Sequence, residues 1–230
     1  MPLYYYNFQY LIYILPGLLL AMWAQAKIQR AYGEYSRVRS SSGLTGREVA
    51  RQILDRNGLY DVSIEPIKGQ LTDHYDPRDK TLRLSEGIYN SASVAAVSIA
   101  AHECGHAIQD ATDYRALRIR TSLVPIANFG SRFSFWIIIL GYLFTSGTLL
   151  IKTGIWLFAA TVLFQIVTLP VEFNASNRAM EQLESGFLTS GEMEGTKSVL
   201  SAAAMTYVAS TLMAIGSFLR ILSMFSRDRR

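Results

Sequence analysis

Residues 102–106 read His102-Glu103-Cys104-Gly105-His106 and follow an uncharged run at residues 91–101. Residues four apart lie on one face of an α-helix, so both imidazoles can reach one metal ion. Glu103 can bring its carboxylate beside a metal-bound water. Imidazole nitrogens suit zinc, and a third protein ligand would leave the fourth position open for water. The pattern therefore predicts a zinc hydrolase rather than an ordinary helix with two solvated or core histidines.

Three residues are candidates for the third ligand. Asp110 lies four residues after His106, but three successive positions of this spacing extend over about 12 Å of helix, too far for one ion. His74 is the one remaining histidine, and a surface role is the simpler expectation for it. Glu172 is the only acidic residue between Asp113 and Glu181, at the end of an apolar segment where a buried charge needs a partner. Glu172 is the best candidate, and Asp110 and His74 stay open.

The polar region before the histidine pair contains signals for one helix and a small sheet. Thr45 and Glu48 have capping-box spacing and predict a helix that ends at Asn57-Gly58. A strand is expected at 62–67, and the turn-forming residues 76–79 predict a hairpin of strands 71–75 and 81–84.

The metal helix itself should begin after a cap at Asn90 or Ser91 and continue to about Ala111. Strand 81–84, which precedes it, is a candidate edge to which an extended peptide could add.

Four segments carry no charged residue and approach or exceed the roughly 20 residues that cross a bilayer as a helix: 2–26, 133–151, 153–171 and 198–219. Only Lys152 separates the second segment from the third, which predicts a tight hairpin. The fourth is rich in small residues that suit close helix packing and either spans or forms a buried or interfacial helix. Three or four transmembrane helices are therefore expected, with the lipid bilayer as a partner.

The distribution of charge predicts the orientation in the membrane. Residues 27–132 hold 15 of the 22 basic residues, and Lys and Arg accumulate in cytoplasmic segments. We therefore attribute the excess of basic over acidic residues to the orientation of the chain in the membrane and not to nucleic-acid binding. Residues 24–26 have the form of a signal-peptide cleavage site, but no positive charge precedes the apolar run, which favours an uncleaved anchor. The single cysteine, Cys104, excludes an internal disulfide and fits a reducing compartment.

Residues 170–179, Pro-Val-Glu-Phe-Asn-Ala-Ser-Asn-Arg-Ala, resemble the second motif of gluzincin peptidases, in which a glutamate on a second helix completes the metal site. With the metal helix and residues 74–78, they make the chain similar to the neutral zinc metallopeptidases of the bacterial YugP type. HtpX and the CAAX prenyl proteases are more distantly similar, and there too two spans can separate the histidine pair from the glutamate. The resemblance implies Zn²⁺ held by His102, His106 and Glu172, with Glu103 as general base.

One position departs from the wider gluzincins. Where they carry an aspartate that orients a ligand histidine, this chain has Ser176, and Asn174 or Asn177 could share that task. Arg178 could stabilise an oxyanion or pair with Glu181, and pairing is the expected role. Cys104 points away from the histidine face and is expected to be a small buried residue.

The expected fold is a mainly α membrane protein with a small α+β, gluzincin-like metalloprotease module. Its expected parts are an N-terminal anchor, a cytoplasmic zinc-peptidase module, a transmembrane hairpin, a helix with the second motif, and a C-terminal membrane or core helix with a basic tail: 1–26, 27–122, 123–171, 172–197 and 198–230.

The expected function is that of a zinc-dependent metalloendopeptidase in the bacterial inner or plasma membrane. It would hydrolyse peptide bonds of protein or peptide substrates, including membrane or misfolded proteins, by Glu-assisted attack of zinc-bound water. The alternative is a membrane scaffold or adaptor with a structural zinc site, which would need four protein ligands. A channel or transporter is disfavoured because the first three apolar segments lack ionisable residues.

Overall fold

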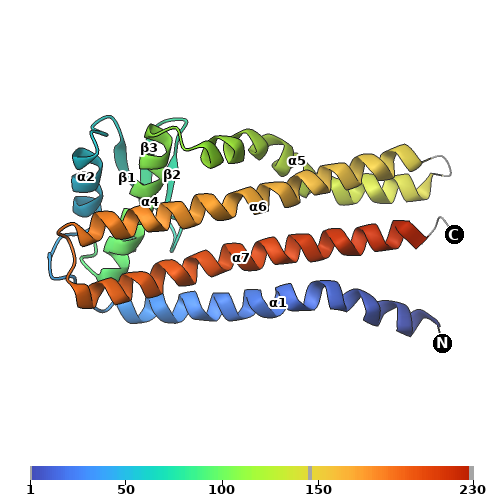
Figure 1. Cartoon of the computed structure of the whole chain (residues 1–230), viewed down its shortest axis with the longest axis horizontal. Helices are drawn as coiled ribbons and strands as arrows, with labels where there is room; N and C mark the ends of the chain where they lie inside the picture. The colour runs from blue at the N-terminus through green and yellow to red at the C-terminus, as the bar shows by residue number, and fades with distance from the viewer. Residues whose placement is uncertain (1, 145–146, 228–230) are drawn as a thin grey trace. The chain divides into compact units, whose positions relative to one another are not determined.

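The computed structural model describes residues 2–144 and 147–227, with side chains for 11–144 and 147–225. The side chains of the expected basic tail, Arg227, Arg229 and Arg230, lie outside the described residues. In chain order the elements are α1 (Pro2–Tyr35), α2 (Gly46–Arg56), β1 (Ser63–Ile67), β2 (His74–Asp76), β3 (Thr81–Ser85), α3 (Glu86–Tyr89), α4 (Val94–Ala111), α5 (Arg115–Leu143), α6 (Thr148–Glu184) and α7 (Ser190–Arg227) (Figure 1).

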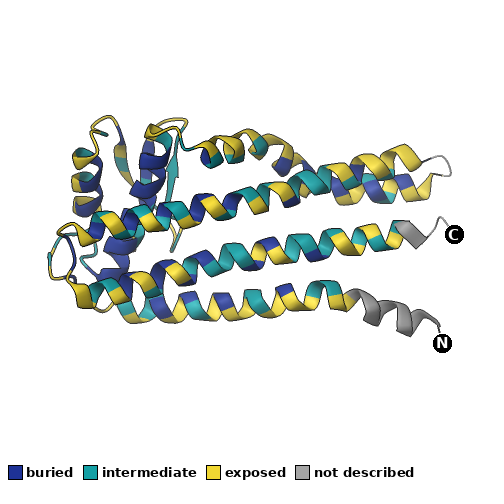
Figure 2. Ribbon diagram, in the orientation of Figure 1, coloured by how far each residue is buried: buried dark blue, intermediate teal, exposed yellow. Residues whose placement is uncertain are grey.

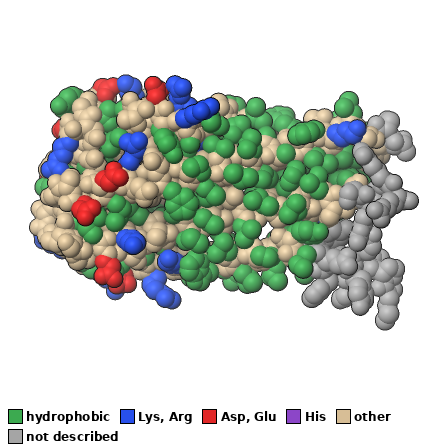
Figure 3. Space-filling model, viewed as in Figure 1, with side chains coloured by type: hydrophobic (Ala, Val, Ile, Leu, Met, Phe, Trp, Pro, Cys, Tyr) green, Lys and Arg blue, Asp and Glu red, His purple; other side chains and the backbone are tan. Residues whose placement is uncertain are grey.

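The chain divides into two compact units. The apolar unit comprises Met1–Trp23, Arg118–Leu169 and Thr206–Arg230, and the α+β unit comprises Ala24–Leu117 and Pro170–Met205. On the face drawn in Figure 3, hydrophobic side chains cover the long helices, whereas charged side chains gather over the α+β unit.

Four helices are long and apolar enough to cross a membrane: Leu11–Tyr35, Arg115–Leu143, Thr148–Glu184 and Ser190–Phe225. Many of their large apolar side chains are exposed or half-buried and few are buried, as Figure 2 shows for the long helices. Glycines allow close packing inside the apolar unit, since a Cβ at Gly130 would collide with the Leu157 carbonyl and one at Gly216 with the Tyr13 carbonyl. The structure thus has the mainly helical fold with four candidate spans, including the fourth segment.

The hairpin between the second and third apolar segments turns earlier than the sequence indicated. α5 ends at Leu143 and α6 begins at Thr148, so Lys152 lies inside α6 and does not form the turn. The expectation was wrong because it used charge alone, whereas a single Lys near a helix end can extend toward water without ending the helix.

Helix α2 confirms the capping-box prediction. The Thr45 side chain accepts from the Glu48 N–H at 3.3 Å, and the Glu48 carboxylate accepts from the Thr45 N–H at 2.8 Å. Asn57 forms the C-cap, and the apolar face of α2 is fully buried.

The sheet has the order β1-β3-β2, with β1 parallel and β2 antiparallel to β3. The predicted hairpin is confirmed as β2–β3. The prediction that β3 offers an edge is wrong, because β1 pairs with its other side; this pairing joins residues distant in sequence and has no local signal. Both Leu82 and Leu84 of the central strand are fully buried, and β2 is an edge strand.

The metal helix is α4, and most of its residues are buried (Figure 2). Its N-cap is Ser93, whose hydroxyl accepts from the Ala96 N–H at 3.2 Å. The expected caps were wrong because the short helix α3 occupies residues 86–89 and ends at Asn90. The predicted end at Ala111 is confirmed.

Candidate metal centre

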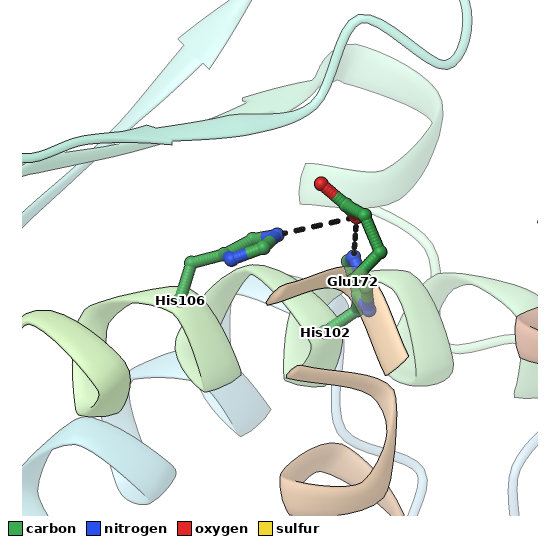
Figure 4. A group of neighbouring side chains, drawn as sticks. All are labelled: His102, His106 and Glu172. Atoms are coloured by element: carbon green, nitrogen blue, oxygen red, sulfur yellow. Dashed lines mark hydrogen bonds and ion pairs between the residues drawn. The ribbon is translucent and has the colours of Figure 1, made fainter. Parts of the chain in front are cut away.

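Helices α4 and α6 bring His102, His106 and Glu172 together within the α+β unit (Figure 4). The Glu172 Oε2 atom lies 3.3 Å from His102 Nε2 and 3.6 Å from His106 Nε2. One ligand atom from each of the three residues lies within 4.8 Å of the others. Glu172 is only 2% exposed, so its charge is removed from water and faces two ring nitrogens.

Gly105 allows the two helices to approach this closely. A Cβ at Gly105 would lie 2.5 Å from the Ala175 carbonyl oxygen on α6. Real Cβ atoms do not approach oxygen so closely, so any side chain here would push α6 away from α4. The glycine inside the histidine pentapeptide therefore sets the distance between the histidines and the glutamate.

The opposite ring nitrogen of each histidine has a polar partner. His102 Nδ1 lies 3.2 Å from the Ser176 hydroxyl, so Ser176 occupies the orienting position considered from the sequence. His106 Nδ1 lies 3.0 Å from Gln109 Oε1, and Gln109 is fully buried. With both Nδ1 atoms occupied in this way, the Nε2 atoms face Glu172.

Glu103 is buried beside the centre, with 7% exposure. Burial raises the pKa of its carboxyl to about 7, a shift that the neighbouring His102 opposes. The backbone of Tyr75 on β2 lies against the carboxylate and lowers its pKa by a smaller amount. A cation bound at the centre would favour the charged form and lower this pKa.

The other candidate ligands lie elsewhere. The Asp110 carboxylate accepts from the Tyr75 hydroxyl at 2.9 Å, and His74 Nδ1 lies 2.9 Å from the Thr72 carbonyl. Neither belongs to the metal-binding group found among the described residues. Cys104 is buried as expected, and burial raises the pKa of its thiol.

Arg178 does not form its expected pair. Among the described ion pairs none joins it to Glu181; its Nε donates instead to Asn174 Oδ1 at 2.9 Å. Asn174 also accepts from Gln109 Nε2 at 3.0 Å, so this arginine is tied to the Nδ1 side of His106.

Sequence reasoning missed two contributors, Gln109 and Tyr75. Gln109 follows His106 by three residues, a spacing at which helical side chains contact each other, so the spacing was an available signal. No comparable local signal connects Tyr75 to Glu103, because β2 and α4 meet only in the folded unit.

The donor set fits zinc. Two imidazole nitrogens and one carboxylate oxygen form the His₂Glu set of catalytic zinc sites, which leave one position open for water or substrate. Both Nε2 atoms face the buried carboxylate, an arrangement that a cation bound between the three residues would stabilise. The fold and the centre together define a mainly helical protein with four candidate membrane spans and a three-residue candidate metal centre.

Residues 10–226 match the family described as "Putative neutral zinc metallopeptidase", and the chain belongs to that family. It is 48% identical over 211 residues to a Bacillus subtilis (strain 168) protein named "Putative membrane protease YugP", covering 91% of this chain and 93% of that protein. No solved structure matches the chain. Zinc is the metal of the family, and the family assignment drawn from the sequence is confirmed.

Proposed function

We propose that this protein is a membrane-embedded zinc metalloendopeptidase that hydrolyses peptide bonds of protein or peptide substrates. The observation that carries the proposal is the meeting of His102, His106 and Glu172 within 4.8 Å, with the buried carboxylate of Glu103 beside them. The family described as a zinc metallopeptidase supports the same conclusion.

Each residue has a distinct task in this proposal. When bound, zinc lowers the pKa of a coordinated water toward neutrality and polarises the scissile carbonyl. Glu103 accepts the proton of the attacking water and passes it to the leaving amine. In the metal-free protein burial raises its pKa to about 7, and a bound zinc ion would lower this pKa, so that the carboxylate is charged and able to accept a proton near neutral pH.

The substrate would bind as an added strand along β2. Among the described residues β2 pairs with β3 alone, and it packs beside α4. Its residue Tyr75 contacts Glu103 through the backbone, so a peptide extended along this edge passes the general base. Backbone hydrogen bonds at such an edge bind peptides with little regard to sequence, which suits unfolded or membrane proteins as substrates.

The alternative is a membrane scaffold with a structural zinc. Structural zinc sites usually have four protein ligands, and among the described residues the metal-binding group has three. An acid–base group buried beside three ligands favours the peptidase.

The enzyme would be a multi-pass protein of the bacterial plasma membrane, with the site in the cytoplasm. In a Cys104→Ala background, Lys68→Cys in intact cells should be protected from an impermeant thiol reagent, and Lys152→Cys should react. The basic residues at 27–132 give the physical reason. Reaction at position 68 from outside would place the site on the other face of the membrane.

Glu103→Gln is the decisive variant for the reaction. Since Glu103 is not a proposed ligand, the variant should keep its zinc, its membrane insertion and its melting temperature, yet cleave casein at least roughly 100-fold more slowly. Zinc content and cleavage rate are measured on protein purified in mild detergent with controlled zinc. Glu181→Gln, an exposed position on α6, is the matched control.

Equal rates for wild type and Glu103→Gln would show that another base or a contaminating protease acts. If the zinc-loaded wild type cleaves none of several unfolded and membrane proteins, the scaffold alternative replaces the peptidase. If the wild type cleaves and Glu103→Gln does not, a comparison of the membrane proteomes of cells with each protein would identify natural substrates.

A further inference from the structure

Behind the metal centre, four polar side chains form a continuous hydrogen-bonded chain from α4 to α6. His106 Nδ1 lies 3.0 Å from Gln109 Oε1, and Gln109 Nε2 lies 3.0 Å from Asn174 Oδ1. Arg178 Nε closes the chain at 2.9 Å from the same Asn174 oxygen. Gln109 Nε2 also donates to the Val171 carbonyl at 2.8 Å.

The direction of every hydrogen bond in this chain can be assigned from its two fixed ends. Arg178 can only donate, and the Val171 carbonyl can only accept. The Asn174 atom that faces Arg178 is therefore oxygen, and the Gln109 atom that faces Val171 is nitrogen. This leaves Gln109 Oε1 as an acceptor toward His106, so the proton of the neutral imidazole sits on Nδ1.

The position of this proton determines which ring nitrogen of His106 can bind a metal ion. With the proton on Nδ1, the lone pair of His106 is on Nε2, the atom 3.6 Å from Glu172 Oε2. The hydrogen bond made by one ring nitrogen determines which nitrogen binds metal. Gln109 is fully buried, so water does not compete for this bond.

We propose that Gln109 and Asn174 form a positioning relay, anchored by Arg178, that holds His106 in the tautomer and orientation of a zinc ligand. The inference rests on the proposed zinc centre. Gln109 at His106 and Ser176 at His102 are both neutral side chains, so the Nδ1 contact of each histidine is with an uncharged partner. The negative charge among the three proposed ligands then comes from Glu172 alone.

The test compares zinc dissociation constants, measured by chelator competition on the full chain in detergent. Gln109→Leu removes the acceptor and should weaken zinc binding about 10- to 100-fold, the usual cost of losing such a partner. Gln109→Glu retains an acceptor for Nδ1 but loses the two donated bonds, so it should bind zinc at least as tightly as wild type while the apoprotein melts at a lower temperature.

The far end of the relay provides a matched pair of variants. Asn174→Ala should weaken zinc binding less than Gln109→Leu, because it acts through Gln109. Asn177→Ala, an exposed position on the same helix, should leave zinc binding unchanged. Absorption bands of the Co²⁺-substituted protein should change in Gln109→Leu and Asn174→Ala and match wild type in Asn177→Ala.

Three outcomes separate this inference from the proposed function. Equal zinc affinity and identical Co²⁺ spectra in wild type and Gln109→Leu would overturn the relay while leaving the metal centre intact. Loss of zinc affinity in Gln109→Glu equal to that in Gln109→Leu would reduce Gln109 to a packing role and also overturn it. A wild type that binds no zinc would overturn the proposed centre and the relay with it.

Discussion

In the apolar unit, large side chains such as Leu149, Trp156 and Leu163 are exposed, whereas in the α+β unit Ile53 and Leu82 are fully buried. Among the described residues of the α+β unit, the large apolar side chains that remain exposed are Val38, Tyr60 and Phe173. The surface of a water-soluble protein rarely presents a continuous apolar area like that of the apolar unit. The contrast fits the proposal that lipid surrounds the apolar unit and water surrounds the α+β unit, which the second of the predictions below tests.

Buried polar groups differ between the units in the same way. In the apolar unit, the Thr168 hydroxyl donates to the Phe164 carbonyl of its own helix, a bond that satisfies one side chain locally. In the α+β unit, Gln109 and Glu172 are buried and connect different helices. The apolar unit also has polar contacts between helices, from the Thr211 hydroxyl to the Gln165 carbonyl at 3.3 Å and from the Thr161 hydroxyl to the Ala127 carbonyl at 3.4 Å. These contacts join one hydroxyl to one backbone carbonyl, whereas the buried contacts at the metal centre include a carboxylate.

The largest expected effect is the loss of the glutamate ligand. Glu172→Ala should weaken zinc binding by more than the about 10- to 100-fold typical of losing a partner behind a ligand, because it removes a ligand itself. Zinc content after dialysis against a weak chelator measures this, and Glu181→Ala on the same helix is the control. Full zinc retention in Glu172→Ala would show that α6 supplies no metal ligand. Asp110 and His74 would then again be candidates for the third ligand.

The next largest effect tests whether lipid covers the apolar unit. Leu163→Lys places a charge on an exposed, uncharged part of α6 and should cost about 2.5–3.5 kcal/mol of insertion free energy near a helix centre. Tyr60→Lys is the control, since a surface change in a water-exposed unit costs within about 0.5 kcal/mol. The fraction of chain in the alkali-resistant membrane pellet should fall for Leu163→Lys alone; equal fractions would contradict the two-solvent interpretation.

Features with short-range signals were predictable from the sequence. The capping box at Thr45, the hairpin around residues 76–79 and the histidine pair four residues apart all depend on local spacing, and the structure contains each. Glu172 was identified as an isolated acid beside an apolar segment, and the structure places it against both histidines.

Features that join distant segments were not predictable in the same way. Because β1 pairs in parallel with β3, β3 is the central strand and β2 has a free edge. No local sequence pattern encodes such a pairing. Ser93 caps α4 because the short helix α3 precedes it, and a cap preference alone does not show where one helix ends and the next begins. The contact of Gln109 with His106 had a local signal in their spacing, but its bonds to Val171 and Asn174 join another helix and had none.

A smaller effect tests how closely packed the metal centre is. Gly105→Ala would press a methyl group against the Ala175 carbonyl, and overpacking of this kind costs about 1–3 kcal/mol. Gly33→Ala is the matched control, because a Cβ there meets nothing within 4 Å and Ala is favoured over Gly in a helix by about 0.5–1 kcal/mol. Melting temperatures should fall for Gly105→Ala and stay or rise for Gly33→Ala. An unchanged melting temperature and zinc affinity in Gly105→Ala would mean that the two helices can separate without cost.

The smallest effect lies on the water-exposed side of the comparison, at Asp76 on β2. Hydrogen bonds from the Arg78 guanidinium, opposed by partial desolvation, hold the pKa of Asp76 at about 2, below its ordinary value of 3.8. A carboxyl whose pKa is lower in the folded state stabilises the fold above its unfolded pKa, and this contribution is lost as the pH falls from about 4 to about 2. Because Arg78 is 87% exposed, the pair should contribute no more than about 1 kcal/mol.

Asp76→Asn should therefore melt slightly below wild type at pH 7, and the difference should shrink as the pH approaches 2. Melting curves of both proteins at pH 7, 5 and 3 measure it. A difference that persists unchanged at pH 3 would show that Asp76 acts through the geometry of its turn and not through its charge.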